Sequence, residues 1–311
     1  MRPAIVTGVC PVLETPFDRE GRVDTASFEA LIEHHLRAGV RSVMFPGYAS
    51  EFHKLTDEER NTLTAVLLSR TRGVPDFTAV ISVPDHATAV AVERARAAAR
   101  QGADAVNVLP PHLLGPSADA VREHIAAVAE AVNPTPVILQ YAPAQTGTAL
   151  DAASIARIAD AAPNLVQVKV ESTPPGALIS ALGKTTPALS SLVGYGGVQL
   201  IDALRRGAVG VQPGSSFPEL YLRIWRDWHR GETEAAIALH ARLLPYLSYW
   251  MQSVELIIAA EKRISLLRGI IRTDVCRAPY RELDAYESAS IDRFLAEFED
   301  DLAAGVEGRR G

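Results

Sequence analysis

The sequence predicts an α/β fold, a parallel (β/α)8 (TIM) barrel with a C-terminal helical appendage. Short runs of β-branched and aliphatic residues alternate with alanine-rich stretches along the first two thirds of the 311-residue chain, which is typical of repeated βα units. Eight strand–helix pairs fit the barrel, whereas a doubly wound open sheet is expected to have about five or six strands. The first strand also runs into Leu13–Phe17 without the glycine turn that binds phosphate in such sheets.

Eight segments have the composition of buried strands. They are Gly8 to Leu13, Arg41 to Phe45, Phe77 to Val83, Ala105 to Leu109, Val137 to Tyr141, Val166 to Val170, Leu189 to Val193 and Gly210 to Gln212. The helices expected after them span residues 25–38, 56–71, 86–101, 117–132, 151–161, 174–182, 197–206 and 217–230.

Several of these helices have readable start and stop signals. Thr56 followed three residues later by Glu59 is a capping box. Gly39, Gly102 and Gly207 follow expected helix ends, where the left-handed backbone conformation favours glycine. Each of these glycines precedes another strand, so the helices and strands form a regular repeat.

After about residue 232 the strand signals stop. We expect the barrel to span residues 1–231, a helical region residues 232–305 with helices near 233–268 and 285–304, and a disordered tail residues 306–311. Five large aromatic residues lie in or just before this helical region: Trp225, Trp228, Tyr246, Tyr249 and Trp250. We interpret them as core residues rather than as a cofactor-binding cluster.

Composition excludes several classes of protein. The apolar content of 48%, the charged content of 22% and the net charge of −6 are those of an ordinary soluble protein and argue against a nucleic-acid surface. No apolar run approaches the roughly 18 residues of a membrane span, and no secretory leader is visible. Cys10 and Cys276 form no ligand pair, and the eight histidines show no metal spacing. We therefore expect a cytoplasmic protein without a metal, a membrane partner or a nucleic-acid partner.

One of only four lysines, Lys169, lies in the otherwise apolar strand Leu165–Val170. The strand period of two places Gln167, Lys169 and Glu171 on one face, and we expect that face to line the barrel interior. A buried ammonium group is costly unless it is paired or has lost its proton. A neutral amine is also the nucleophile that forms a Schiff base with a carbonyl compound. The alternative is that the lysine stem packs while its head group reaches water.

Other distinctive side chains follow the ends of predicted strands, where barrels of this kind carry their active sites. The segments are Gly47–Glu51, Pro110–His112, Tyr141–Pro143 and Gly194–Gly197. A phenol at Tyr141 could carry protons beside a Schiff-base lysine, although a rim tyrosine is an equal alternative. The glycine turn at Gly47 could present N–H groups to a carboxylate.

These residues resemble those of the N-acetylneuraminate lyase and dihydrodipicolinate synthase superfamily of pyruvate-type class I aldolases. The resemblance covers nearly the whole chain. It includes the segments Gly8–Val9 through Thr15–Phe17, Gly47–Glu51 with Leu55, Thr56 and Glu59, Tyr141 with Pro143 and Thr146–Gly147, Lys169, and Gly207–Gly210. It implies a cofactor-free enzyme that is a homo-oligomer, a dimer or a tetramer built from dimers.

The resemblance also implies roles for individual residues. Lys169 would form the Schiff base with a 2-oxo acid, and Tyr141 would be the proton relay. The residues implied to bind the substrate are Gly47, Ala49, Ser50, Gly210 and Gln212, and further contacts are possible from Tyr48, His112, Glu171 and Gly194.

Departures from the family pattern bear on the substrate. The loop that usually reads Gly-Thr-Thr-Gly-Glu is Gly-Tyr-Ala-Ser-Glu at residues 47–51, so the hydroxyl of its third position is absent. The tyrosine pair of the synthases is replaced by His112–Leu113, and their arginine before Thr-Gly by Gln145. A lysine-pathway synthase is therefore disfavoured. The loops resemble more closely those of 2-keto-3-deoxy sugar acid dehydratases, such as the L-arabonate type.

The sequence thus predicts a lyase that cleaves or dehydrates a 2-oxo acid, such as a 2-keto-3-deoxy sugar acid, through a lysine Schiff base. Two alternatives stay open. One is a synthase that condenses pyruvate with an aldehyde. The other is a barrel that binds a 2-oxo acid as a sensor without turnover.

Overall fold

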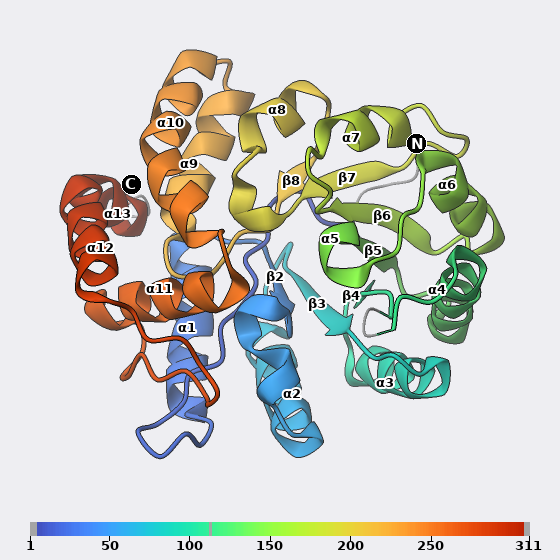
Figure 1. The fold of residues 1–311 in the computed structure, drawn as a ribbon, viewed down its shortest axis with the longest axis horizontal. Coiled ribbons are helices and arrows are strands. Elements are labelled where there is room, and N and C mark those ends of the chain that lie inside the picture. The colour runs from blue at the N-terminus through green and yellow to red at the C-terminus, as the bar shows by residue number, and fades with distance from the viewer. Residues whose placement is uncertain (1–4, 112–113, 308–311) are drawn as a thin grey trace. The chain divides into compact units, whose positions relative to one another are not determined.

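The fold is the predicted (β/α)8 barrel, seen in a computed structural model that describes residues 5–111 and 114–307 (Figure 1). Its strands are β1 (Gly8–Val9), β2 (Ser42–Phe45), β3 (Thr78–Val83), β4 (Ala105–Val108), β5 (Val137–Tyr141), β6 (Leu165–Val170), β7 (Ser190–Val193) and β8 (Gly210–Val211). Each lies within a residue or so of a predicted segment, except that β1 is four residues shorter at its end.

The helices between the strands also match the prediction. They are α1 (Thr25–Ala38), α2 (Asp57–Thr71), α3 (Thr88–Gln101), α4 (Ala118–Val132), α6 (Ala152–Ala161), α7 (Gly176–Leu182), α8 (Leu200–Arg205) and α9 (Pro218–His229). Four short elements were not predicted: η1 (Tyr48–Ser50), η2 (Phe52–Lys54), α5 (Pro143–Thr146) and η3 (Tyr195–Gly197). All four follow the ends of strands, so the loops at that end carry structure of their own.

The capping box and the glycine helix ends predicted from the sequence are present in the structure. The Thr56 hydroxyl accepts a hydrogen bond from the Glu59 N–H at 3.2 Å, and the Glu59 carboxylate accepts one from the Thr56 N–H at 2.9 Å. Gly39 and Gly102 end α1 and α3 with φ of 90° and 98°. These contacts satisfy backbone groups that the helix ends would otherwise leave unpaired.

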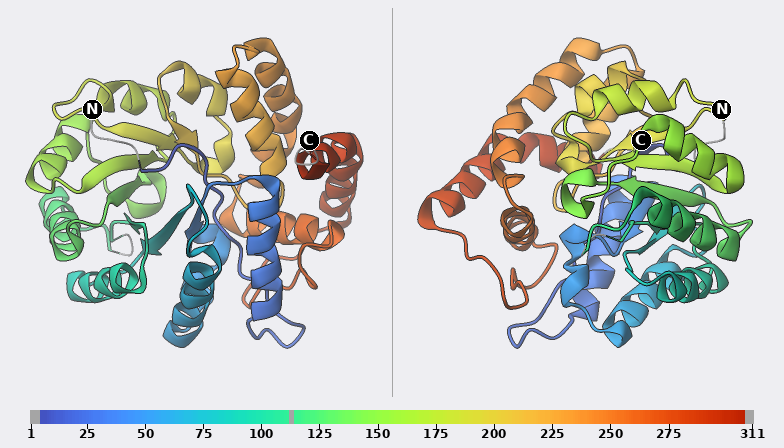
Figure 2. Two further views of the ribbon diagram at one scale, coloured as in Figure 1. Left: turned by 180° about the vertical axis from the view of Figure 1, so that it is seen from behind. Right: turned by 45° about the vertical axis from the view of Figure 1, so that its right-hand side comes forward.

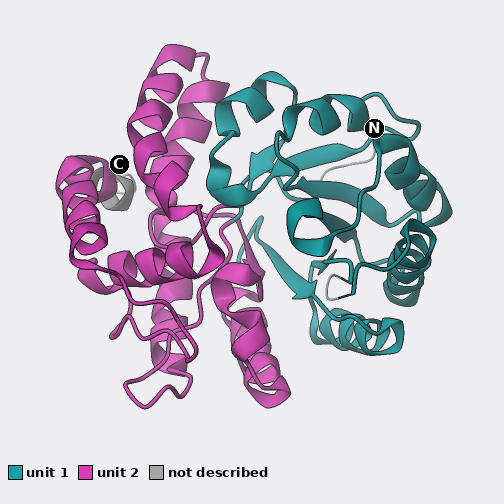
Figure 3. Ribbon diagram, in the orientation of Figure 1, with its two compact units in different colours: residues 1–10, 73–212 teal, residues 11–72, 213–311 magenta. Residues whose placement is uncertain are grey.

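Two compact units make up the chain (Figure 3). Unit 1 comprises residues 1–10 and 73–212, and unit 2 comprises residues 11–72 and 213–311. The predicted domain boundary near residue 231 falls inside unit 2, just after α9 (Pro218–His229), and it stays a prediction.

In unit 1, seven strands pair in parallel in the order β1-β8-β7-β6-β5-β4-β3. Helices α3, α4, α6 and α7 lie along the outside of these strands and contact one another in turn (Figures 1 and 2). The strand side chains therefore divide into a set that faces the helices and a set that faces the interior. Gln167 belongs to the interior set, because its side-chain amide pairs with the backbone N–H and C=O of Val6 at 3.1 and 2.8 Å.

Unit 2 contains β2, α1, α2, α9 and the C-terminal helices α10 (Thr233–Trp250), α11 (Val254–Leu267), α12 (Ala285–Glu297) and α13 (Glu299–Glu307). Aromatic rings fill part of its core, as expected: the Phe294 ring centroid lies 5.2 Å from that of Trp250 and 5.3 Å from that of Tyr246. Tyr249 differs from the prediction and is 47% exposed, and Trp225 and Trp228 are only half-buried. Residues 306–307 are part of α13, and the rest of the predicted tail lies outside the described residues.

Within residues 5–111 and 114–307, no helix combines the length and the apolar character that crossing a bilayer requires.

A group of buried charges lies inside unit 2. Glu51 is fully buried and pairs with Lys262 Nζ and, at 3.1 Å, with Lys54 Nζ. Glu261 accepts a hydrogen bond from the Ser216 N–H at 2.8 Å, and burial raises its pKa. Glu14 is 1% exposed. Its burial raises the pKa of its carboxyl to about 7, against the opposing effects of the Ser265 hydroxyl and the Lys262 ammonium.

This environment predicts a pH-dependent stability. Because the pKa of Glu14 is higher in the folded protein than the ordinary 4.5, the folded state keeps a proton that the unfolded chain releases. This difference in proton binding contributes fully to the free energy of unfolding below pH 4.5, and the contribution is lost as pH rises to about 7. Glu14→Gln, which is permanently neutral, should therefore be more stable than the parent at pH 8 by roughly 3 kcal/mol.

Urea unfolding at pH 4.5 and pH 8 measures the difference. The advantage of Glu14→Gln should shrink towards zero at pH 4.5, and Glu20→Gln at an exposed carboxyl is the control. An advantage of Glu14→Gln that is equal at both pH values would contradict the assignment.

Candidate active site

Lys169 lies on the interior face of β6, as predicted from the strand period. Its side chain is 5% exposed, and its Nζ lies 3.1 Å from Glu171 Oε1. The head group therefore does not reach bulk water. The amine is therefore paired inside the protein, and the alternative of a head group that reaches water is not what the structure has.

Glu171 is a central residue of this site rather than a peripheral contact. Its Oε2 accepts a hydrogen bond from Gln140 Nε2 at 2.7 Å, and its Oε1 accepts one from the Tyr195 N–H at 3.3 Å in addition to the Lys169 contact. The carboxylate thus receives three donors from three segments: β6, β5 and η3. Such a set of donors fixes both the position and the orientation of a carboxylate.

A row of polar side chains extends from Glu171 across the neighbouring strands. Asn107 Nδ2 of β4 donates to Gln140 Oε1 at 3.0 Å and to Ser82 Oγ of β3 at 2.9 Å. The direction of the row follows from the carboxylate, because an ionised carboxylate only accepts hydrogen bonds. Gln140 must therefore present its NH2 to Glu171 and its carbonyl oxygen to Asn107.

Gly194 makes room for Glu171. A Cβ atom built at residue 194 would lie 2.4 Å from Glu171 Cγ and 2.5 Å from its Oε1. Such distances are far inside van der Waals contact. Gly194 therefore has a packing role, and its possible contact with substrate stays a prediction.

Tyr141 lies elsewhere than predicted. In the β5–β6 register, Gln140 is opposite Lys169 and Tyr141 is opposite Val170. Paired residues of parallel strands point to the same face, so Gln140 shares the interior face with Lys169 and Tyr141 shares the outer face with Val170. The Tyr141 Oη accepts a hydrogen bond from the Leu150 N–H at 3.0 Å. The expected phenol beside the amine is thus replaced by a carboxamide.

The Gly47–Glu51 loop belongs to unit 2 and forms the turn η1. The Ser50 hydroxyl donates to the Leu13 C=O and accepts from the Gly47 N–H at 2.8 Å. The Ser50 and Glu51 N–H groups bond to the Gly47 and Tyr48 carbonyls at 2.9 and 3.0 Å. A hydroxyl has one proton to donate, and here the backbone uses it. Both donors of Ser50 therefore bond to the backbone in this structure, and the substrate-binding roles of Gly47, Tyr48, Ala49 and Ser50 stay predictions.

Two glycines that were predicted to bind substrate lie where neighbouring atoms leave no space for a side chain. A Cβ at Gly47 would lie 2.6 Å from Val12 Cγ1, and a Cβ at Gly210 would lie 2.4 Å from the Gly8 C=O oxygen. Gln212 Nε2 donates to Cys10 Sγ at 3.3 Å. His112 lies outside the described residues.

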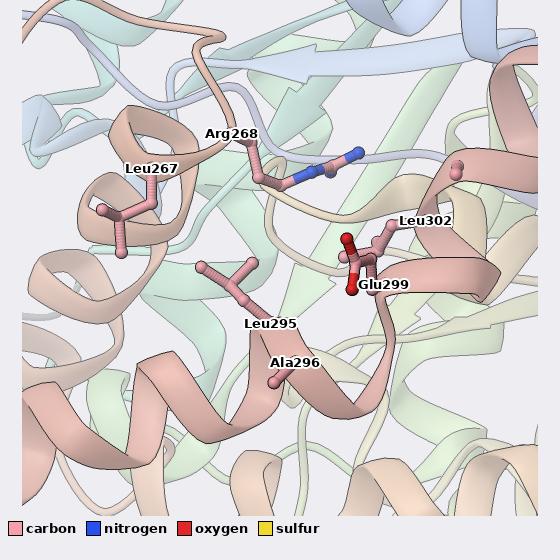
Figure 4. Close-up of a pocket in the computed structure, with 7 residues that line it drawn as sticks. Leu267, Arg268, Leu295, Ala296, Glu299 and Leu302 are labelled. Atoms are coloured by element: carbon pink, nitrogen blue, oxygen red, sulfur yellow. The ribbon is translucent and has the colours of Figure 1, made fainter.

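Unit 2 has a cavity of about 450 Å3 (Figure 4). It is lined by Leu267, Arg268, Leu295, Ala296, Glu299, Leu302 and Ala303, from the end of α11 and from α12 and α13. Arg268, its one cation, is already paired with Glu219 at 2.8 Å. This cavity offers no nucleophile, and we do not assign the chemistry to it.

Residues 5–111 and 114–307 include histidine, cysteine, aspartate and glutamate side chains of the kinds that bind metal ions. Within this part of the chain, no three His, Cys, Asp or Glu side chains are grouped as metal ligands would be.

The fold is a (β/α)8 barrel with a buried lysine at the end of β6, and comparison with known proteins identifies its family. The family model of the dihydrodipicolinate synthetase family matches residues 5–297, so the chain belongs to that family. Enzymes of this family include synthases, aldolases and dehydratases.

Individual relatives are distant but cover most of the chain. L-2-keto-3-deoxyarabonate dehydratase of Azospirillum brasilense is 28% identical over 89% of each chain. 4-Hydroxy-tetrahydrodipicolinate synthase of Synechococcus sp. (strain CC9605) is 31% identical over 76% of this chain and 78% of its own. The structure of YagE from Escherichia coli K12, in complex with pyruvate, superimposes with a TM-score of 0.87 at 24% identity, covering 95% of this chain and 99% of that one.

Sequence reasoning missed Gln140, Asn107 and Ser82 as parts of the site. Their strands were predicted, but an amide in a strand gives no sign of its partners. For Glu171 the signal was present, because it lies two residues after Lys169 and therefore on the same face.

The close packing of Glu171 against Gly194 predicts that a side chain at residue 194 destabilises the fold. Gly194→Ala should destabilise the fold by about 1–3 kcal/mol, because the added methyl group must displace the Glu171 carboxylate from its three donors. Thermal unfolding measures the loss. Gly183→Ala is the matched control, since a Cβ there meets nothing closer than 3.8 Å. Equal melting temperatures for both variants would contradict the packing role of Gly194.

Proposed function

We propose that this protein is a cofactor-free lyase that binds a 2-oxo acid as a Schiff base on Lys169 and then breaks a C–C or C–O bond of the substrate. The observation that carries the proposal is the buried amine of Lys169 beside the Glu171 carboxylate, in a chain of the dihydrodipicolinate synthetase family. An amine enclosed with a proton acceptor can become the neutral nucleophile that attacks a ketone.

The chemistry of the Schiff base explains why one lysine serves both kinds of bond cleavage. Condensation of the amine with the C2 ketone releases water and leaves an iminium ion. The iminium draws electrons from C3, so the C3 proton can leave or the C3–C4 bond can break, with the electron pair held as an enamine. If a hydroxyl is present at C4, the enamine can expel it, which is a dehydration.

A 2-keto-3-deoxy sugar acid is the proposed substrate class, and dehydration is the proposed reaction. The similarity to the Azospirillum dehydratase over 89% of the chain supports this choice. The similarity to the Synechococcus synthase supports a second candidate, condensation of pyruvate with an aldehyde, which runs through the same enamine in the opposite direction. The sensor function, the cytoplasmic location and the homo-oligomer stay predictions.

Reductive trapping tests the proposed nucleophile. With pyruvate and sodium borohydride, the purified protein should gain one reduced pyruvate adduct, because borohydride reduces the iminium to a stable secondary amine. Peptide mass spectrometry should locate the adduct on Lys169. Lys169→Ala should prevent it, whereas Lys184→Arg, which changes an exposed lysine, should not.

An adduct on another lysine, or no adduct on the folded parent protein, would contradict the proposal. A panel of 2-keto-3-deoxy sugar acids then distinguishes the reactions. Release of pyruvate indicates aldol cleavage, and a 2-oxo acid semialdehyde indicates dehydration.

A further inference from the structure

We infer that Glu171 is the acid/base residue that moves protons at the Lys169 amine and at C3 of the substrate, and that the phenol of Tyr141 does not have this role. The inference rests on the proposed function, because it assigns a second residue to the same reaction. Strand register, the hydrogen-bonding partners of the Glu171 carboxylate and the chemistry of the neighbouring Gln140 amide support it.

The group that faces the Lys169 amine from β5 is a carboxamide, that of Gln140. The register pairs Gln140 with Lys169, and the Gln140 side chain contacts Glu171 on the interior face. A carboxamide does not gain or lose a proton near neutral pH. Gln140 can orient its neighbours, but it cannot carry a proton.

The nearest group to the Lys169 amine that can carry a proton is the Glu171 carboxylate. Glu171 Oε1 lies 3.1 Å from Lys169 Nζ, within the reach that general acid–base transfer requires. Tyr141 is paired with Val170, on the other face of the sheet, and its Oη is held by the Leu150 N–H. Among the described residues of unit 1, Glu171 is therefore the titratable side chain placed to serve Lys169.

Of the two oxygens of Glu171, Oε1 is the one that can take and return the proton. Oε2 accepts a hydrogen bond from Gln140 Nε2, and Gln140 cannot turn its amide over without losing the bond from Asn107 to its Oε1. The amide row therefore keeps Oε2 as an acceptor in both protonation states. A proton added to Oε1 can be donated back towards the Lys169 side, so Gln140 is a positioning residue and Glu171 the proton carrier.

The Glu171 carboxyl group can supply and accept every proton that the reaction moves. Glu171 takes a proton from the Lys169 ammonium, and the neutral amine adds to the C2 ketone to give a carbinolamine. The Glu171 carboxylic acid then protonates the carbinolamine hydroxyl, which leaves as water and produces the iminium and the carboxylate. The same carboxylate removes a proton from C3 to give the enamine, and in a dehydration the acid protonates the departing C4 hydroxyl. Hydrolysis of the iminium by water reverses the first two steps.

Exchange of the pyruvate methyl protons in deuterated water tests the inference without knowledge of the natural substrate. The parent protein should catalyse exchange at C3, read by proton NMR. Glu171→Ala should reduce the exchange rate by about 100-fold or more, the scale of general acid–base catalysis, and added formate should restore it in proportion to its concentration. Tyr141→Phe, which removes only the phenol oxygen, should stay within about threefold of the parent.

The outcomes separate the two proposals. Exchange by Glu171→Ala at the parent rate, or a loss of exchange in Tyr141→Phe instead, overturns the role of Glu171 while leaving Lys169 as the nucleophile. A loss in Glu171→Ala that formate does not restore, although circular dichroism shows a folded protein, assigns Glu171 a packing role and also overturns the inference. If the parent itself neither exchanges pyruvate protons nor forms the borohydride adduct, the proposed function fails.

Discussion

The ion pair between Lys169 and Glu171 is the interaction on which the account of this protein depends. Burying two charges costs several kcal/mol each, and the attraction between them compensates only where other groups satisfy the remaining hydrogen-bonding positions. Gln140 and the Tyr195 N–H provide this for Glu171. A buried pair is weak evidence of stability, so its presence on the interior face of β6 is better explained by chemistry than by folding.

Several strands contribute to keeping this pair in place. The amide row from Ser82 through Asn107 to Gln140 links β3, β4 and β5 and ends on the carboxylate. Gly194 leaves the volume that the Glu171 side chain occupies. Parallel strands of a barrel give such a row a rigid support, because each residue's height is fixed by the register with its neighbours.

The fold and one half of the site could be predicted from the sequence. Alternating strand and helix signals were sufficient for the barrel, because each βα unit repeats the same local pattern. The period of two was sufficient to place Lys169 and Glu171 on the interior face, since it depends only on residues of one strand. Tyr141 and Gln140 are different, because which of them faces Lys169 depends on the register between β5 and β6, and one sequence does not give that register. The hydrogen bond of the Ser50 hydroxyl could not be predicted either, because its acceptor, the Leu13 carbonyl, lies 37 residues away in the chain.

The most direct measurement is a crystal structure of the protein grown with pyruvate and without a reducing agent. The proposed Schiff base predicts continuous electron density between Lys169 Nζ and C2 of pyruvate. It also predicts the Glu171 carboxylate within hydrogen-bonding distance of the nitrogen and of C3, with Gln140 still bound to its second oxygen. Pyruvate bound without a covalent link to Lys169, or a Schiff base from which the Glu171 carboxylate has turned away, would contradict it.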